Sequence, residues 1–156
     1  IDLLITNQEE ALRLSGKKVL KEAMHFFRDN GTGAVIVTNG AKNLSLFTNN
    51  KSMFQEIKHT EMPVSDLVTR QMVEKTNGDT TGCGDNFAGG VIAGIVTQLQ
   101  NGKEKINLKE ACIWGIVSGG FSCFYMGGTY HQKEPGDKRK LIIPYYDDYI
   151  KQLENE

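Results

Sequence analysis

A glycine-rich segment directly before an apolar helix is the feature that most restricts how this chain can fold. Residues 79–85 have the sequence D-T-T-G-C-G-D, and residues 86–99 carry apolar side chains almost all round a helical projection. A helix of that kind is normally buried. The glycines, with one small residue between them, expose backbone N–H groups at the positive end of the helix dipole. We therefore expect a fold that buries this helix and presents its N-terminus to an anion such as phosphate.

Asp85 places a carboxylate at the start of that helix. Among backbone donors a carboxylate repels phosphate, so it has no use in a loop that only binds phosphate. It has a use if it faces a hydroxyl group and accepts the hydroxyl proton while the backbone amides hold a phosphoryl group. The alternative is a glycine-rich turn with an acidic helix cap, which is common in α/β proteins. Composition alone leaves both interpretations open.

Strands and helices are expected to alternate along the chain, which predicts a layered α/β sheet. An Asn-Gly turn at residues 39–40 predicts a hairpin. Residues 49–71 show no clear period, and no linker or repeat is visible, so we expect a single domain over residues 1–156. The expected strands are 1–6, 34–38 (an inner strand), 44–48 and 73–76. The expected helices are one capped by Asn7 and ended by Gly16, and then 17–30, 86–99, 107–125 and 145–153.

Composition limits the classes of function. Of 156 residues, 39% are hydrophobic and 24% are charged, which is enough apolar surface for a globular core. A formal net charge of -1 argues against a nucleic-acid-binding surface. The longest apolar stretch, Gly89 to Val96, is too short to span a bilayer. We expect a cytoplasmic protein whose partner is a small molecule, with neither nucleic acid nor membrane as a ligand. Because the chain opens at Ile1 directly in an apolar strand, we expect a preceding segment.

The cysteines are Cys83, Cys112 and Cys123, an odd number without a C-x-x-C pair. This pattern predicts reduced thiols rather than a disulfide framework or a zinc site. Cys83 lies where a helix N-terminus lowers a thiol pKa, so a nucleophilic role has to be considered. The competing interpretation, which we favour, is that Cys83 fills a position in the anion-binding loop that requires a small side chain.

The string at residues 79–85 closely resembles the D-T-x-G-A-G-D signature of the ribokinase-like, phosphofructokinase-B type family of carbohydrate kinases. Six positions agree, and Cys83 replaces the usual alanine. The resemblance implies that Asp85 is the catalytic base. It also implies that Gly82, Cys83 and Gly84 form the anion hole.

Earlier segments fall in the order that the family has. Asn7 and Glu10 resemble its N-x-x-E motif, which implies a part in placing magnesium and the phosphates. The same pair also fits an ordinary capping box, and both interpretations can hold together. Thr38 and Gly40 resemble the family's T-x-G segment, near the phosphates of the nucleotide. A hairpin turn explains that segment without a ligand.

Residues 116–128 resemble the family's adenine-side helix and loop, which implies that Ser118 and Gly119 leave room for the base. Close helix packing is the alternative explanation for these small residues. Asp79 and Thr81, with backbone near Gly127, resemble a monovalent-cation site found in several members. Residues 54–72 form a longer segment than the family usually has.

The resemblance as a whole implies a ribokinase-like layered α/β sheet with helices on both faces, of which this sequence is the C-terminal portion. The N-terminal half, with its glycine-rich sugar site and lid strands, is absent from the sequence. The implied activity is transfer of the γ-phosphoryl group of ATP to a hydroxyl of a sugar or nucleoside. The implied cofactors are ATP, Mg²⁺ and a monovalent cation such as K⁺, and a homodimer is a further expectation. The alternatives are a nucleotide-binding regulatory module without catalysis, against which Asp85 argues, and an interaction domain.

Overall fold

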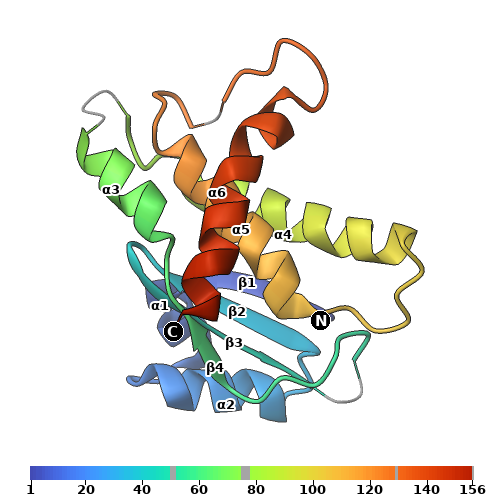
Figure 1. Ribbon diagram of the computed structural model, residues 1–156. Coiled ribbons are helices and arrows are strands. Elements are labelled where there is room, and N and C mark those ends of the chain that lie inside the picture. The colour runs from blue at the N-terminus through green and yellow to red at the C-terminus, as the bar shows by residue number, and fades with distance from the viewer. Residues whose placement is uncertain (50–51, 75–77, 129, 156) are drawn as a thin grey trace. The chain divides into compact units, whose positions relative to one another are not determined.

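The computed structural model describes residues 1–49, 52–74, 78–128 and 130–155 (Figure 1). Its residues separate into two compact units, each described by itself. One unit comprises Ile1–Val64 with Gly102–Leu108, and the other comprises Ser65–Asn101 with Lys109–Glu156. The single domain expected from the sequence stays a prediction. No helix among the described residues is long and apolar enough to cross a membrane.

A four-stranded sheet in the order β1-β2-β3-β4 forms the centre of the first unit. The strands are β1 (Leu4–Asn7), β2 (Ala34–Asn39), β3 (Lys42–Thr48) and β4 (Thr60–Met62). β1 and β2 are parallel, whereas β3 is antiparallel to both β2 and β4. The β-branched run of β2 is buried from Ala34 to Val37, as expected for an inner strand. β4 lies within residues 49–71, the segment that shows no clear period.

The predicted hairpin at residues 39–40 is confirmed. Asn39 pairs with Lys42, so Gly40 and Ala41 form the turn, and β3 begins two residues earlier than expected. Gly40 has a φ of 57°, in the left-handed region that favours glycine. The turn therefore sets the register between β2 and β3.

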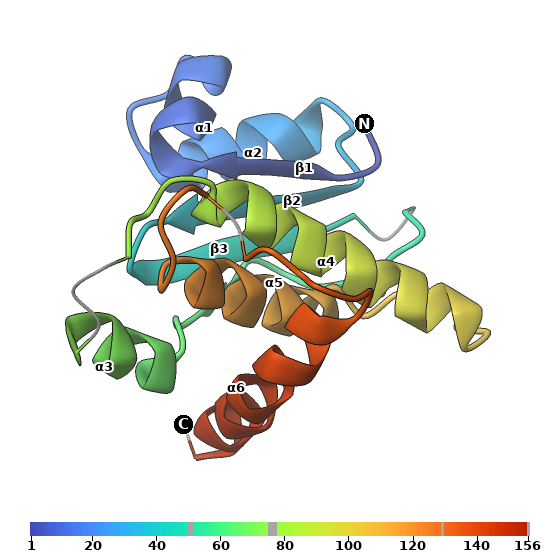
Figure 2. The same cartoon turned by 90° about the horizontal axis from the view of Figure 1, so that it is seen from above.

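Two helices, α1 (Gln8–Ser15) and α2 (Leu20–Asp29), lie on the same face of the sheet (Figures 1 and 2). α1 ends at Gly16, whose φ of 67° gives the left-handed cap expected from the sequence. Both helices are amphipathic, and their apolar faces form one core with the sheet. The buried members of this core are Ala11, Ala23, Met24, Phe27, Val35, Val37 and Phe47.

The second unit is helical. Its helices are α3 (Asp66–Glu74), α4 (Cys83–Gln100), α5 (Leu108–Ser122) and α6 (Asp137–Glu154). α3 packs on α6, where the backbone N–H of Asp66 donates to Gln152 (2.9 Å) and the hydroxyl of Tyr145 donates to Gln71 (2.6 Å). Together with the sheet of the first unit, these helices confirm the predicted α/β class.

Several expected boundaries are wrong. A strand was expected at residues 73–76, but residues 73–74 are the last residues of helix α3. Residues 75–76 lie outside the described part of the chain. α3 is a helix because Ser65 begins it, accepting the Val68 N–H with its hydroxyl and the Thr69 N–H with its carbonyl. α5 ends at Ser122 rather than near residue 125. α6 starts eight residues before the predicted start and contains Pro144 in its interior.

A close contact between helix backbones joins α4 to α5, which run alongside each other in Figure 2. A Cβ added to Gly90 would lie 2.5 Å from the carbonyl oxygen of Trp114, and one added to Gly94 would lie 2.8 Å from Cα of Ala111. From the other side, a Cβ on Gly115 would lie 2.6 Å from a methyl carbon of Val91. Only glycine permits these approaches.

The prediction that the helix after the glycine-rich segment is buried all round is wrong. α4 buries the face that meets α5, including Phe87 and Val91. Its remaining apolar residues are exposed by 55% at Ile92, 42% at Val96 and 48% at Leu99. The sequence pattern could not separate the faces of α4 because apolar residues occupy all of them.

We predict opposite effects for alanine at the neighbouring glycines of α4. Gly90→Ala places a methyl group against the backbone of Trp114 and should lower the free energy of unfolding by about 1–3 kcal/mol. A Cβ at Gly89 meets nothing within 4 Å, so Gly89→Ala should raise it by about 0.5–1 kcal/mol through helix propensity. Urea titrations followed by far-UV circular dichroism measure both. Equal midpoints for the two variants would contradict the packing.

Candidate active site

The glycine-rich loop ends in the first turn of α4. Gly82 is the N-cap, with φ 71° and ψ 1°, and Cys83, Gly84 and Asp85 follow it as the first helical residues. The first N–H groups of a helix have no partner within the helix, so they point outward at its positive end. Of these, the N–H of Cys83 is directed to the carbonyl of Thr80 at 3.3 Å, a long hydrogen bond. The loop therefore places backbone N–H groups at the positive end of α4, and its binding of an anion stays a prediction.

Asp79 holds the beginning of this loop. Its carboxylate accepts the backbone N–H of Thr81 at 2.7 Å. That bond, with smaller contributions from the Thr81 side chain and the Gly127 backbone, lowers the pKa of Asp79. An ionised carboxylate therefore lies beside the backbone of both Thr81 and Gly127.

A second glycine pair packs against the loop. Gly127 and Gly128 both have positive φ values, 89° and 84°. A Cβ on Gly82 would collide with the carbonyl of Gly128, so a side chain at Gly82 is excluded twice, by its φ and by the lack of space. The segment after α5 thus fixes the shape of the loop before α4.

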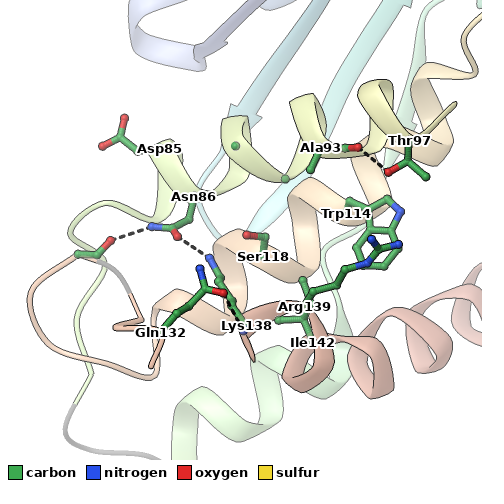
Figure 3. Close-up of a pocket in the computed structure, with 13 residues that line it drawn as sticks. Asp85, Asn86, Ala93, Thr97, Trp114, Ser118, Gln132, Lys138, Arg139 and Ile142 are labelled. Carbon is green, nitrogen blue, oxygen red and sulfur yellow. Dashed lines mark hydrogen bonds between the residues drawn. The ribbon is translucent and has the colours of Figure 1, made fainter. Parts of the chain in front are cut away.

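Asp85 is exposed and lines a cavity of about 550 Å³ within the second unit. In Figure 3 its carboxylate points away from Asn86 and Lys138, toward the outside of the first turn of α4. The carboxylate is therefore open to a ligand that approaches the helix N-terminus. The other residues that line the cavity are Asn86, Gly89, Gly90, Ala93, Thr97, Trp114, Ser118, Gly128, Gln132, Lys138, Arg139 and Ile142.

Ser118 and Gly119 lie on the face of α5 that meets α4. Ser118 is buried and lines the cavity. A Cβ on Gly119 would lie 2.9 Å from the carbonyl oxygen of Cys83 and 3.1 Å from Cβ of Phe87. The geometry at Gly119 is therefore that of close helix packing, the alternative that the sequence left open. The adenine-binding role of both residues stays a prediction.

Asn7 and Glu10 form the predicted capping box in the first unit. The side-chain oxygen Oδ1 of Asn7 accepts the Glu10 N–H at 2.9 Å, and Oε2 of Glu10 accepts the Asn7 N–H at 3.2 Å. The hydroxyl of Thr6 donates to the same oxygen at 3.0 Å. These bonds, first the one from the Asn7 backbone, lower the pKa of Glu10. The carboxylate oxygens of Glu10 and the amide oxygen of Asn7 are of the type that Mg²⁺ takes as ligands. The described residues contain no cluster of three or more His, Cys, Asp or Glu that could hold a metal ion.

Thr38 lies beside Asn7 in the register of β1 and β2, and its hydroxyl donates to the Thr6 carbonyl at 3.4 Å. Asn7 and Thr38 lie at the carboxyl ends of the parallel strands β1 and β2, and Gly40 follows in the turn after β2. Ligands of open α/β sheets bind at that edge. The structure thus brings Asn7, Glu10 and Thr38 together within the first unit. It brings the loop at residues 79–85 together with Ser118 and Gly119 within the second.

Three residues that the sequence did not single out line the same cavity as Asp85, namely Asn86, Lys138 and Arg139. Lys138, from α6, donates a hydrogen bond to Oδ1 of Asn86. Burial lowers the pKa of Lys138. Arg139 lies over the ring of Trp114, 5.5 Å from its centroid. Asn86 directly follows the motif at residues 79–85, and this position was a signal in the sequence. Lys138 and Arg139 carried no such signal, because they precede the expected start of the last helix at residue 145.

The prediction of reduced thiols is wrong for two cysteines. Cys83 and Cys123 form a disulfide, with their Cα atoms 6.2 Å apart across 40 residues of sequence. The contact arises because Gly119 packs against Cys83, and Cys123 lies one helical turn further along the chain. In this state Cys83 carries no thiolate, so the nucleophilic interpretation has no support. Cys112 is free and buried, and burial raises its pKa to about 12.

Fold and loop together define an α/β protein in which a glycine-rich loop begins a helix and a carboxylate lies in the first turn of that helix. A sequence profile described as pfkB family carbohydrate kinase matches residues 1–134. The chain therefore belongs to the pfkB family of carbohydrate kinases, as the motif at residues 79–85 predicted.

Known relatives agree with this assignment. A cytidine kinase from Thermococcus kodakarensis is 28% identical over 94 residues, which are 60% of this chain and 29% of that protein. The crystal structure of a ribokinase from Thermotoga maritima matches 99% of this chain with a TM-score of 0.61 and 23% identity. A protein from Escherichia coli assigned as ribokinase II, crystallised with ATP and Mg²⁺, matches 97% with a TM-score of 0.65 and 19% identity. The chain spans only 42% and 39% of these two structures.

We predict that thiol counting distinguishes the cysteines. Without reductant, the unfolded chain should react with one equivalent of a maleimide, at Cys112, and after reduction with three. Peptide mass spectrometry should find the linked peptides that contain Cys83 and Cys123. The Cys123→Ser variant is the control and should give two reactive thiols without reductant. Three reactive thiols in the unreduced wild type would contradict the pairing.

Proposed function

We propose that this chain is the nucleotide-binding and catalytic part of a kinase that transfers the γ-phosphoryl group of ATP to a hydroxyl of a sugar or nucleoside. The observation that carries the proposal is the position of Asp85. Its exposed carboxylate lies in the first turn of α4, immediately after the left-handed turn at Gly82. The backbone N–H groups at this helix N-terminus suit the phosphate of the donor, and the Asp85 carboxylate suits the hydroxyl of the acceptor.

In this proposal Asp85 accepts the proton of the attacking hydroxyl as the oxygen approaches phosphorus. The backbone N–H groups of Gly82, Cys83 and Gly84 stabilise the negative charge on the transferred group. Such fixed donors require no reorganisation during the reaction. The left-handed conformation of Gly82 supports this role because it turns the chain into the helix and aims these amides outward.

Residues of the first unit are proposed to serve the nucleotide and its metal ion. Asn7 and Glu10 would help to hold Mg²⁺, which when bound neutralises charge on the phosphates. The lowered pKa of Glu10 supports this role because it keeps the carboxylate ionised at neutral pH. Thr38 and Gly40 are proposed to border the phosphates, from the carboxyl edge of β1 and β2. The E. coli relative bound to ATP and Mg²⁺ supports the same pair of cofactors.

Two further roles in the second unit follow from the same proposal. Asp79 and the backbone near Thr81 and Gly127 would hold a monovalent cation such as K⁺, because an ionised carboxylate there lies among main-chain groups. Ser118 and Gly119 are proposed to lie beside the adenine. The relatives are kinases of cytidine and, by assignment, ribose, which supports a sugar or nucleoside as the acceptor.

We predict that Asp85→Asn lowers kcat by about 10²–10⁴-fold, because the amide cannot accept the hydroxyl proton. Nucleotide affinity should change little, since the backbone donors remain. The assay follows ADP formation with ATP, Mg²⁺ and a panel of sugars and nucleosides, using the longest natural form of the protein. Asp147→Asn, at an exposed position of α6, is the matched control. Full activity of Asp85→Asn would overturn the mechanism.

A further inference from the structure

Asn86 is the residue directly after Asp85, and its side-chain amide bridges two segments that are far apart in sequence. The nitrogen Nδ2 donates to the carbonyl of Gly82 at 2.8 Å and to the carbonyl of Gly128 at 2.7 Å. Gly82 is the N-cap of α4, whereas Gly128 follows α5, 42 residues beyond Asn86. One amide group therefore holds the loop that carries the anion-binding N–H groups against the loop that packs on it.

The contact with Lys138 fixes which way the Asn86 amide faces. An ammonium group donates hydrogen bonds and accepts none, so the group that it meets must be the oxygen Oδ1. The nitrogen Nδ2 is then directed at the two carbonyls, each of which can only accept. Figure 3 shows Lys138 and Asn86 joined by the first of these bonds. The reversed amide would place an oxygen against two carbonyl oxygens.

This arrangement meets a need of the loop. The backbones of Gly82 and Gly128 lie so close that a Cβ on Gly82 would be 2.3 Å from the Gly128 carbonyl oxygen, and both glycines have positive φ values. Glycine is free to adopt many backbone conformations, so this loop keeps one shape only if surrounding bonds determine it. The bonds from Asn86 act on the carbonyls and leave the outward-facing N–H groups of the loop for a ligand.

We infer that Asn86 is a positioning residue, which with Lys138 orders the loop at residues 80–85 so that its N–H groups are aligned for phosphate. The inference rests on the proposed function for its phosphate ligand, whereas the ordering of the loop stands on the geometry alone. Asn86 acts through the backbone, and its neighbour Asp85 points the other way in Figure 3. It is thus distinct from the catalytic base.

The decisive variant is Asn86→Leu, which keeps the size of the side chain but removes both donors. Amide hydrogen exchange, read by peptide mass spectrometry, should become about tenfold faster in residues 80–86 and 127–128. Exchange within residues 90–98 of α4 should be unchanged. Thr97→Val is the matched control, since Thr97 lines the same cavity and its hydroxyl donates to Ala93 within α4. Unchanged exchange in the loop of a folded Asn86→Leu protein overturns the inference.

Ligand affinity separates positioning from a general effect on folding. Calorimetry should show that Asn86→Leu weakens ATP binding about tenfold and leaves adenosine binding unchanged, because only ATP carries phosphates. An equal loss for both ligands would show a merely structural residue and overturn the inference. If the wild type binds neither ligand, the proposed function fails, and the exchange experiment alone decides whether Asn86 orders the loop.

Lys138→Met provides a second variant should Asn86→Leu not fold. It leaves both donors of Asn86 in place but removes the group that fixes their direction. We expect exchange in residues 80–86 to become about threefold faster, with the same selectivity for ATP over adenosine. Exchange equal to that of the wild type would contradict the role of Lys138 and, with it, the inference.

Discussion

The close backbone contact between α4 and α5 is the constraint on which the second unit depends. Glycines at positions 90, 94, 115 and 119 let the two helices approach until one backbone meets the other. The contact fixes where α4 begins relative to α5, and so it fixes the loop that precedes α4. It also brings Cys123 to Cys83 and the segment after α5 to Gly82. A larger side chain in this contact would force the two helices apart and so move the glycine-rich loop before α4.

The first unit depends on a different constraint, the parallel pairing of β1 with β2. The pairing places Asn7 next to Thr38 at the carboxyl ends of both strands. The capping box then holds Asn7 and Glu10 rigidly at the start of α1. Oε2 of Glu10 serves the cap and Oε1 takes no part in it, so capping leaves one oxygen for the proposed role at the metal ion. A residue can therefore stabilise a helix and still serve a metal-bound nucleotide, as the sequence allowed.

Local signals predicted most of what is local. The capping box at Asn7, the turn at Gly40 and the helix N-terminus after Gly82 each depend on a few neighbouring residues, and each is confirmed. Features that depend on distant residues were missed. Two such contacts are the pairing of Cys83 with Cys123, 40 residues apart, and the bond from Lys138 to Asn86, 52 residues apart. No local sequence pattern predicts a contact at such separations. The last helix was expected over residues 145–153, yet α6 begins at Asp137 and contains Pro144 in its interior.

A calorimetric titration with ATP and Mg²⁺ measures directly whether the loop at Gly82 binds the phosphates of a nucleotide. Gly82→Val should weaken binding at least about a hundredfold, because Gly82 has a φ of 71° and no room for a side chain beside Gly128. Asp147→Asn, at an exposed position of α6, is the control and should bind ATP like the wild type. Equal ATP affinity in a folded Gly82→Val protein, or no ATP binding by the folded wild type, would contradict phosphate binding by this loop.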